Sequence, residues 1–144
     1  MIVRAPQTPE EFERYRDLRW SILRAPWNQP KLTEQDDLEN DDFPIMVCEV
    51  DGIPIGVGRA HFLSEDEAQI RSISVEPEWE GKGIGTIVLK ELEKIVTSKG
   101  AKRIIIHART NAVEFYKKNE YKSVEPSYTL FGEIQHTFME KKIK

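Results

Sequence analysis

The chain has 144 residues, of which 39% are hydrophobic and 32% charged, with eight Gly and eight Pro. This composition excludes disordered, collagen-like and low-complexity chains, and the length favours one domain spanning residues 1–144. The 21 Lys and Arg against 25 Asp and Glu give a net charge of −4. A chain without basic excess is not expected to take nucleic acid or an anionic membrane as its partner.

Segments that would direct the chain elsewhere are not expected either. No run approaches the roughly 18 apolar residues of a membrane span, and charges interrupt the N-terminal stretch where a signal peptide is apolar. The one cysteine, Cys48, allows no intrachain disulfide and no cysteine-rich zinc site, and we expect no metal. We therefore expect a cytoplasmic protein, with Cys48 as a small core residue of a strand.

Hydrophobic patterns and turn residues divide the chain into strands and helices. Thr8, followed by Pro9 and acidic residues, is typical of a helix start, and Gly100 is typical of a helix end. Asp51-Gly52 between two β-rich runs predicts a hairpin. In chain order we expect a strand at 1–5, a helix at 9–23, a second helix, strands at 43–50, 53–63 and 68–75, a helix at 83–99, a strand at 103–108, a helix at 111–118, and one or two final strands. The order β-α-α-β-β-β-α-β-α-β-β indicates an α/β protein with a mixed sheet.

The most informative stretch is RSISVEPEWEGKGIGTIVLKELE, a strand followed by a glycine-rich turn and a helix. Gly81, Gly83 and Gly85 allow the backbone to approach a ligand closely, and the first N–H groups of the helix are unpaired where its dipole is positive. The pattern is typical of an anion site. The alternative is a flexible turn followed by a favourable helix start. A Walker loop is excluded because Gly83, not Ser or Thr, follows Lys82. A dinucleotide fingerprint is excluded because one residue, not two, separates the last two glycines.

At these residues the chain resembles the GNAT superfamily of N-acetyltransferases. VEPEWEGKGIGTIVLKELE is similar to the family's acyl-CoA-binding motif, and HARTNAVEFYKKNEY is similar to its later strand and Phe-Tyr region. LRWSILRAPW, EAQIRSISV and LFGEIQHTFMEK resemble the branch related to ElaA, which includes GNAT domains fused to hotdog thioesterases. The resemblance covers nearly the whole chain and implies a GNAT fold with a splayed central sheet.

The resemblance also implies how acetyl-CoA is held. Amides of the turn grip the pyrophosphate, and the pantetheine arm adds like a strand to residues 73–75, where that strand parts from residues 103–107. The residues expected to contact the coenzyme are Ile73, Ser74, Val75, Gly81, Lys82, Gly83, Ile84, Gly85, Thr86, Arg109, Asn111 and Tyr116.

Three residues depart from the family pattern. Glu80 stands where Gln or Arg is usual, Arg109 stands where many relatives have Asn, and Glu120 lies in the sequence Asn119-Glu120-Tyr121 where Gly-Phe is usual. Arginine at position 109 suits the ElaA-like branch. The departures put one phosphate contact and one turn in doubt, but they do not remove the coenzyme site.

For catalysis, the resemblance implies Tyr116 as the general acid that protonates the departing thiolate, with core packing beside Phe115 as the alternative. The position of the family's carboxylate base falls near Gln69, which accepts no proton, so Glu67 acting through a water is a candidate base. His61 and His107 have the right pKa class but are more often structural. His136 is interpreted as structural or acceptor-side.

The acceptor is the least defined component. Arg71 either contacts an acceptor carboxylate or pairs with a glutamate, and the acidic residues between Glu34 and Asp42 either attract a cationic amine or form a solvated surface. We predict transfer of an acetyl group from acetyl-CoA to a primary amine of a small molecule or peptide, by direct attack. The alternative is a non-catalytic module that binds acyl-CoA as a sensor. A homodimer is compatible with the edge of the last strand.

Overall fold

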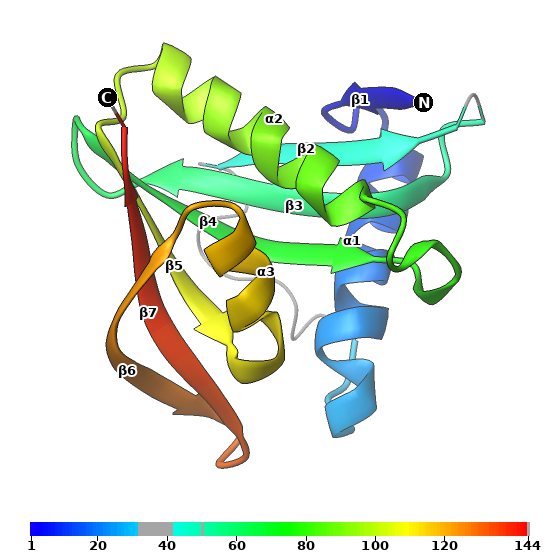
Figure 1. Cartoon of the computed structure of the whole chain (residues 1–144). Coiled ribbons are helices and arrows are strands. Elements are labelled where there is room, and N and C mark those ends of the chain that lie inside the picture. Colours follow the sequence, from blue (N-terminus) through cyan, green and yellow to red (C-terminus); the bar gives the residue numbers. More distant parts are fainter. Residues whose placement is uncertain (32–41, 50, 144) are drawn as a thin grey trace.

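The computed structural model describes residues 1–31, 42–49 and 51–143, which form a seven-stranded mixed sheet with helices on both faces (Figure 1). The strands lie in the order β1-β2-β3-β4-β5-β7-β6, and all neighbours are antiparallel except β4 and β5. The elements are β1 (Ile2–Arg4), α1 (Pro9–Leu23), η1 (Ala25–Trp27), β2 (Phe43–Cys48), β3 (Pro54–Phe62), β4 (Glu67–Val75), η2 (Pro77–Trp79), α2 (Ile84–Ser98), β5 (Arg103–Arg109), η3 (Thr110–Ala112), α3 (Val113–Lys118), β6 (Lys122–Leu130) and β7 (Ile134–Lys142), where η marks a short 3-10 helix.

The predicted mixed α/β fold is confirmed, and α1 has the predicted bounds. The side chain of Thr8 caps α1 by accepting a hydrogen bond of 3.1 Å from the backbone N–H of Glu11. The second helix expected before β2 is absent from residues 24–31 and 42, where the structure has only η1. The acidic residues 34–41, expected at the rim of the pocket, lie outside the described residues.

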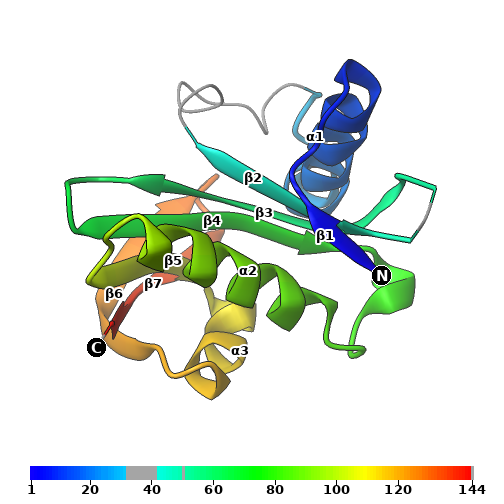
Figure 2. The ribbon, with the colours of Figure 1, turned by 90° about the horizontal axis from the view of Figure 1, so that it is seen from above.

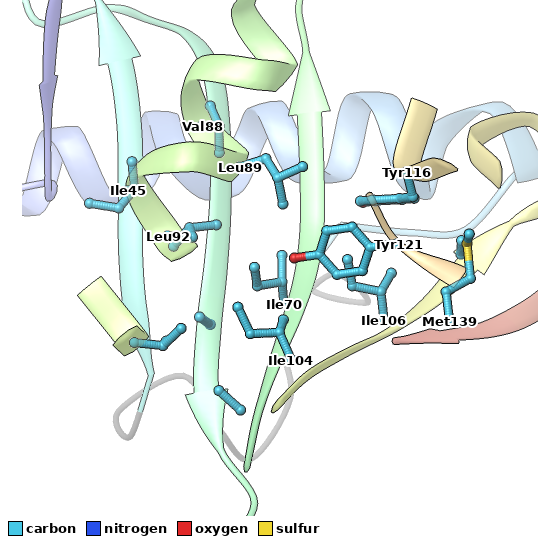
Figure 3. Close-up of a cluster of buried hydrophobic side chains, with 14 of the residues drawn as sticks. Ile45, Ile70, Val88, Leu89, Leu92, Ile104, Ile106, Tyr116, Tyr121 and Met139 are labelled. Atoms are coloured by element: carbon cyan, nitrogen blue, oxygen red, sulfur yellow. The ribbon is translucent and has the colours of Figure 1, made fainter. Parts of the chain in front are cut away.

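The two faces of the sheet have separate cores. Helix α1 lies on one face, and α2 and α3 lie on the other (Figure 2). On the first face, Tyr15 and Leu18 of α1 pack with Met46, Cys48 and Val57, so Cys48 is the core residue that was expected. The larger core, under α2 and α3, contains the labelled residues of Figure 3: Ile45, Ile70, Val88, Leu89, Leu92, Ile104, Ile106, Tyr116, Tyr121 and Met139.

Helix α2 packs closely against β3 because glycine occupies the contact. A Cβ atom at Gly58 would lie 2.6 Å from Val88 Cγ1, and one at Gly56 would overlap Ile84. Such distances leave no room for a side chain. The position of α2, and of the turn that precedes it, therefore depends on two small residues of the neighbouring strand.

Strand β4 carries the irregularity that opens the sheet. Its pairing with β3 shifts between Val57 and Arg59, which leaves Gly58 opposite a bulge, and Ser72 within that bulge has φ +60°. On its other side, β4 pairs with β5 only from Glu67 to Gln69. Beyond Gln69 the two parallel strands separate (Figure 1). The separation leaves the later backbone of β4 without a strand partner on that side.

Candidate active site

A cavity of about 730 Å³ occupies the place where β4 and β5 separate. This volume lies within the usual range of small-molecule sites. The end of α1, residues 69–75 of β4, the turn before α2, the end of β5, α3 and the β6–β7 pair all contribute to its lining. Because α1 and α2 lie on opposite faces of the sheet, the cavity reaches residues of both faces (Figure 2).

The glycine-rich turn forms one end of this cavity. Gly81 and Gly83 have φ of +74° and +84°, conformations that favour glycine, and a Cβ at either position would meet no atom within 4 Å. Gly83 is the N-cap of α2, has no side chain to cap the helix, and no acidic residue lies in the first turn. The free amides at this end therefore suit an anionic ligand.

Tyr116 of α3 lines the cavity and is also part of the larger core. Its ring meets those of Phe115 and Tyr121 edge to face, at centroid distances of 5.0 and 5.7 Å. Burial raises the pKa of the Tyr116 hydroxyl well above its ordinary value, so this group keeps its proton at neutral pH. The neighbouring hydroxyl of Tyr121 is otherwise engaged, since it donates a 2.7 Å hydrogen bond to Glu93.

Two histidines on neighbouring strands line the cavity near its other end. His136 Nδ1 lies 3.0 Å from the carbonyl oxygen of Ile134, and the His136 ring stacks on Tyr128 at 4.3 Å. His107 Nδ1 lies 2.7 Å from the hydroxyl of Ser127. Burial is the largest cause that lowers the pKa of each imidazole, so both are mainly neutral at pH 7.

The bond to Ile134 selects the tautomer of His136. A carbonyl oxygen only accepts, so Nδ1 carries the proton in this hydrogen bond and Nε2 carries the lone pair. His136 is only 6% exposed, and it lies directly opposite Arg109 in the β5–β7 register. A neutral imidazole with a defined lone pair is suited to accept a proton.

Arginines surround the same end of the cavity. Arg109, at the end of β5, donates a 2.9 Å hydrogen bond to the carbonyl of Leu23 at the end of α1. Arg24 follows α1 and lies over the ring of Phe131 at 5.2 Å. Arg71, on β4, also lines the cavity. Positive charge is therefore concentrated where α1 approaches β4 and β5.

The cavity brings together most of the residues that the sequence singled out. Those that line it are Ile73, Ser74, Val75, Gly81, Gly83, Ile84, Gly85, Thr86, Arg109, Asn111 and Tyr116, together with Gln69, Arg71, Glu80, His107 and His136. Lys82 is outside the lining, because its ammonium group lies over the ring of Trp79 at 5.2 Å. His61 is buried in β3 and does not line the cavity.

Glu67 is not placed to act as a base in the cavity. Its carboxylate bonds to Arg103, which also pairs with Glu140, at the end of β4 where the strands are still paired. The guanidinium of Arg103 holds this carboxylate at the paired end of β4 and β5, so we do not propose Glu67 as the base.

Several residues that line the cavity were not predicted from the sequence. Trp79, Tyr128 and Leu130 were not singled out, and neither was Arg24. Trp79 is adjacent to the glycine-rich turn, so proximity to the motif is a signal that could have identified it. Tyr128 and Leu130 lie in β6, which joins the site only through long-range pairing with β7.

A mixed sheet whose parallel strands separate beside an anion-binding turn defines the fold class of the acyl-CoA N-acyltransferases. The chain belongs to the acetyltransferase (GNAT) family, whose pattern matches residues 12–121. It is 34% identical over 124 residues to the uncharacterized N-acetyltransferase YjcF of Bacillus subtilis strain 168, covering 86% of this chain and 87% of that protein.

Solved structures confirm the fold at lower sequence identity. An aminoglycoside 6'-N-acetyltransferase complexed with coenzyme A matches with a TM-score of 0.81 and 17% identity, over 99% of this chain and 97% of the other. Escherichia coli ElaA matches with a TM-score of 0.79 and 18% identity, over 98% of this chain and 97% of the other. Within the residues that the structure describes, no helix has the length and apolar character required to cross a membrane.

Proposed function

We propose that the protein transfers an acetyl group from acetyl-CoA to a primary amine of a small molecule or peptide, by direct attack. The observation that carries this proposal is the cavity itself, which joins an anion-binding turn on one face of the sheet to Tyr116 and His136. The family membership supports acetyl transfer, and the coenzyme A complex of the similar aminoglycoside acetyltransferase supports coenzyme binding.

The donor would be held mainly by backbone groups. The amides between Gly81 and Thr86 would bind the pyrophosphate, and Lys82 would add positive charge from outside the cavity lining. The separated edge of β4 at Ile73, Ser74 and Val75 would pair with the pantetheine arm in the manner of an added strand.

The acceptor amine is an ammonium ion at neutral pH, so its nitrogen must lose two protons while the departing sulfur gains one. The coenzyme supplies the thioester, in which the bond from the carbonyl carbon to sulfur breaks as the bond to nitrogen forms. Tyr116, protonated and buried, would give its proton to the departing sulfur. His136 Nε2 would accept the first nitrogen proton and release it to solvent, and the second, lost after the attack, would restore Tyr116. The amine attacks the thioester directly, so no covalent bond to the enzyme forms.

Acetyl-CoA turnover by the Tyr116→Phe variant tests this function. Thiol release is measured with acetyl-CoA and a broad panel of amines, and coenzyme affinity is measured separately by titration. We expect Tyr116→Phe to lower kcat by about 10²- to 10⁴-fold, the usual contribution of a general acid. The dissociation constant for acetyl-CoA should change little, because the variant loses one hydroxyl and keeps the ring.

Tyr121→Phe provides the matched control. This change removes the hydroxyl that bonds to Glu93 and is expected to lower stability by about 1–3 kcal/mol while leaving turnover largely intact. Equal loss of turnover in both variants would assign Tyr116 a packing role. If the unaltered protein binds acetyl-CoA tightly but acetylates no amine, the sensor function replaces the catalytic one.

A further inference from the structure

The positive side chains at the α1 end of the cavity come from three separate elements. Arg24 follows α1, Arg71 lies in the bulged part of β4, and Arg109 ends β5. Among the described residues that line the cavity, Glu80 is the one carboxylate, and it belongs to the turn that precedes α2. The two ends of the cavity thus differ in the charge of their side chains.

These arginines are close enough to influence one another and the two histidines. Arg24 contributes to lowering the pKa of Arg109, after the larger effect of burial, and Arg71 contributes in the same way to lowering the pKa of His107. Arg109 likewise lowers the pKa of His136. Guanidinium groups remain charged regardless, so the arginines form a cluster of positive charge beside the histidines.

The cluster is separate from the expected phosphate-binding turn. The turn leads into α2 on one face of the sheet, whereas Arg109 bonds to Leu23 of α1 on the opposite face (Figure 2). Along β4, Arg71 precedes Val75 by four residues, or roughly 13 Å of strand. A coenzyme bound at the turn would leave this end of the cavity to the second substrate, which assigns Arg109 to the acceptor instead of to the coenzyme contact that the resemblance implied.

Arginine is chemically suited to bind an oxyanion in this position. A guanidinium has five N–H donors and pairs bidentately with carboxylate or phosphate. The hydrogen bond from Arg109 to Leu23 uses Nη2, and a guanidinium has further N–H donors that can bind a ligand. An amine acceptor that entered from the α1 side would meet this cluster beside His136, which lies opposite Arg109 in the β5–β7 register.

From this geometry, and resting on the proposed acetyl transfer, we infer that the acceptor is a small amine that itself carries an oxyanion, a carboxylate or a phosphonate, bound by Arg24, Arg71 and Arg109. The anionic group fixes the orientation of the acceptor, and its amine lies toward His136 and the donor. Cationic polyamines and aminoglycoside-like acceptors are correspondingly poor substrates, because the cluster repels them.

Matched acceptor pairs test the inference. Amino acids are compared with their carboxamides, and aminoalkylphosphonates with the corresponding alkylamines, by kcat/KM for thiol release from acetyl-CoA. We expect the anionic member of at least one pair type to be preferred by about 10- to 100-fold, as charge-assisted hydrogen bonds provide. The amino-acid pairs test for a carboxylate site, and the phosphonate pairs test for a phosphonate site.

In Arg71→Gln the ratio of kcat/KM between the anionic and the uncharged member of a pair should fall toward one. The affinity for acetyl-CoA should not change. Lys118→Gln makes the same change in net charge on the exposed side of α3, outside the cavity lining, and should leave the preference unchanged. Equal kcat/KM within both pairs, or a preference for cationic amines, would overturn the inference while leaving acetyl transfer in place.

Direct binding separates this inference from the proposed function. The same acceptor pairs are titrated into the protein saturated with desulfo-CoA, which cannot react. Preferential binding of the anionic member, lost in Arg71→Gln, supports the inference even if no amine is acetylated. No preference in binding and none in turnover rejects it.

Discussion

Glu120 has a left-handed backbone conformation, which is unfavourable for glutamate. Its φ is +73°, in the turn between α3 and β6, at the position where the resemblance to the GNAT motif implies glycine. A residue with a Cβ pays about 1–2 kcal/mol in this left-handed region. The side chain recovers little, because it is 82% exposed and its pair with Lys141 is 3.8 Å long.

Glu120→Gly should therefore raise the free energy of unfolding, by about 0.5–1 kcal/mol, once the greater freedom of glycine in the unfolded chain is included. Chemical denaturation of the purified protein measures the change. Glu120→Ala removes the same carboxylate but keeps the Cβ, and it should give no such increase. Equal stabilisation by both variants would assign the effect to charge instead of backbone strain.

His136 makes a second prediction, on pH dependence. A base must be deprotonated, and burial lowers the His136 pKa below the ordinary value of about 6.5. The kcat/KM of the unaltered enzyme should therefore rise with pH through an apparent pKa below 6.5 and be fully developed at neutral pH. Arg109 and His107 lower this pKa, and the carbonyls of Ile134 and Tyr128 oppose them.

In His136→Ala the reaction would depend on amine that is already neutral. The rise of kcat/KM with pH should therefore shift toward the pKa of the acceptor amine. The rate at pH 7 should fall by about 10²- to 10⁴-fold. Thermal unfolding and acetyl-CoA titration show whether the variant is folded. A reduced rate without this shift would indicate that His136 is only structural.

The residues of the glycine-rich turn were predictable from sequence, but the role that we propose for His136 was not. Glycines before a helix reflect local backbone geometry, which a short motif encodes. The environment of His136 depends instead on the register that sets it opposite Arg109 and on stacking with Tyr128 of another strand. Glu67 illustrates the same limit, since its pairing with Arg103 and Glu140 joins residues far apart in the sequence.

At the scale of elements, the contact between α2 and β3 determines where the turn lies. A Cβ at Gly58 would lie 2.6 Å from Val88 and 3.0 Å from Leu92 Cδ1. Gly58→Ala should lower the free energy of unfolding by about 1–3 kcal/mol, the usual cost of overpacking. Because Gly58 also faces the bulge of β4, acetyl-CoA affinity should weaken as well.

A double-mutant cycle with Val88→Ala isolates the steric cause. Val88→Ala removes Cγ1, the atom that the new Cβ would meet. The double variant should therefore be more stable than the summed effects of the two single variants indicate. Strict additivity would mean that loss of glycine flexibility, not contact with α2, explains the effect.

The elements themselves followed well from sequence, with α1 at its predicted bounds and the hairpin and the strand before the turn close to theirs. Caps, turns and hydrophobic periodicity are local signals. The separation of β4 from β5 has no local signal that we could interpret, and it was expected only from the family resemblance. It is defined by how far two distant strands pair, and the unpaired part of β4 also contains a bulge against β3.

At the scale of the whole molecule, the site lies where the sheet opens, and elements on both faces of the sheet line it. One end lies at the start of α2 on one face, and the other lies beside the end of α1 on the opposite face (Figure 2). Donor and acceptor would therefore approach from different sides and meet where β4 and β5 part. This arrangement suits direct transfer in a ternary complex. It requires that the glycine-rich turn anchor acetyl-CoA by its pyrophosphate.

Titration of acetyl-CoA into the unaltered protein, Gly83→Asp and Gly132→Asp tests that anchor most directly. Both glycines have positive φ, +84° and +70°, and neither Cβ would meet an atom within 4 Å, but Gly132 lies outside the cavity lining. We expect micromolar binding that Gly83→Asp abolishes, because its carboxylate would face the pyrophosphate, and that Gly132→Asp preserves. No binding by the unaltered protein, or equal binding by both variants, would contradict it.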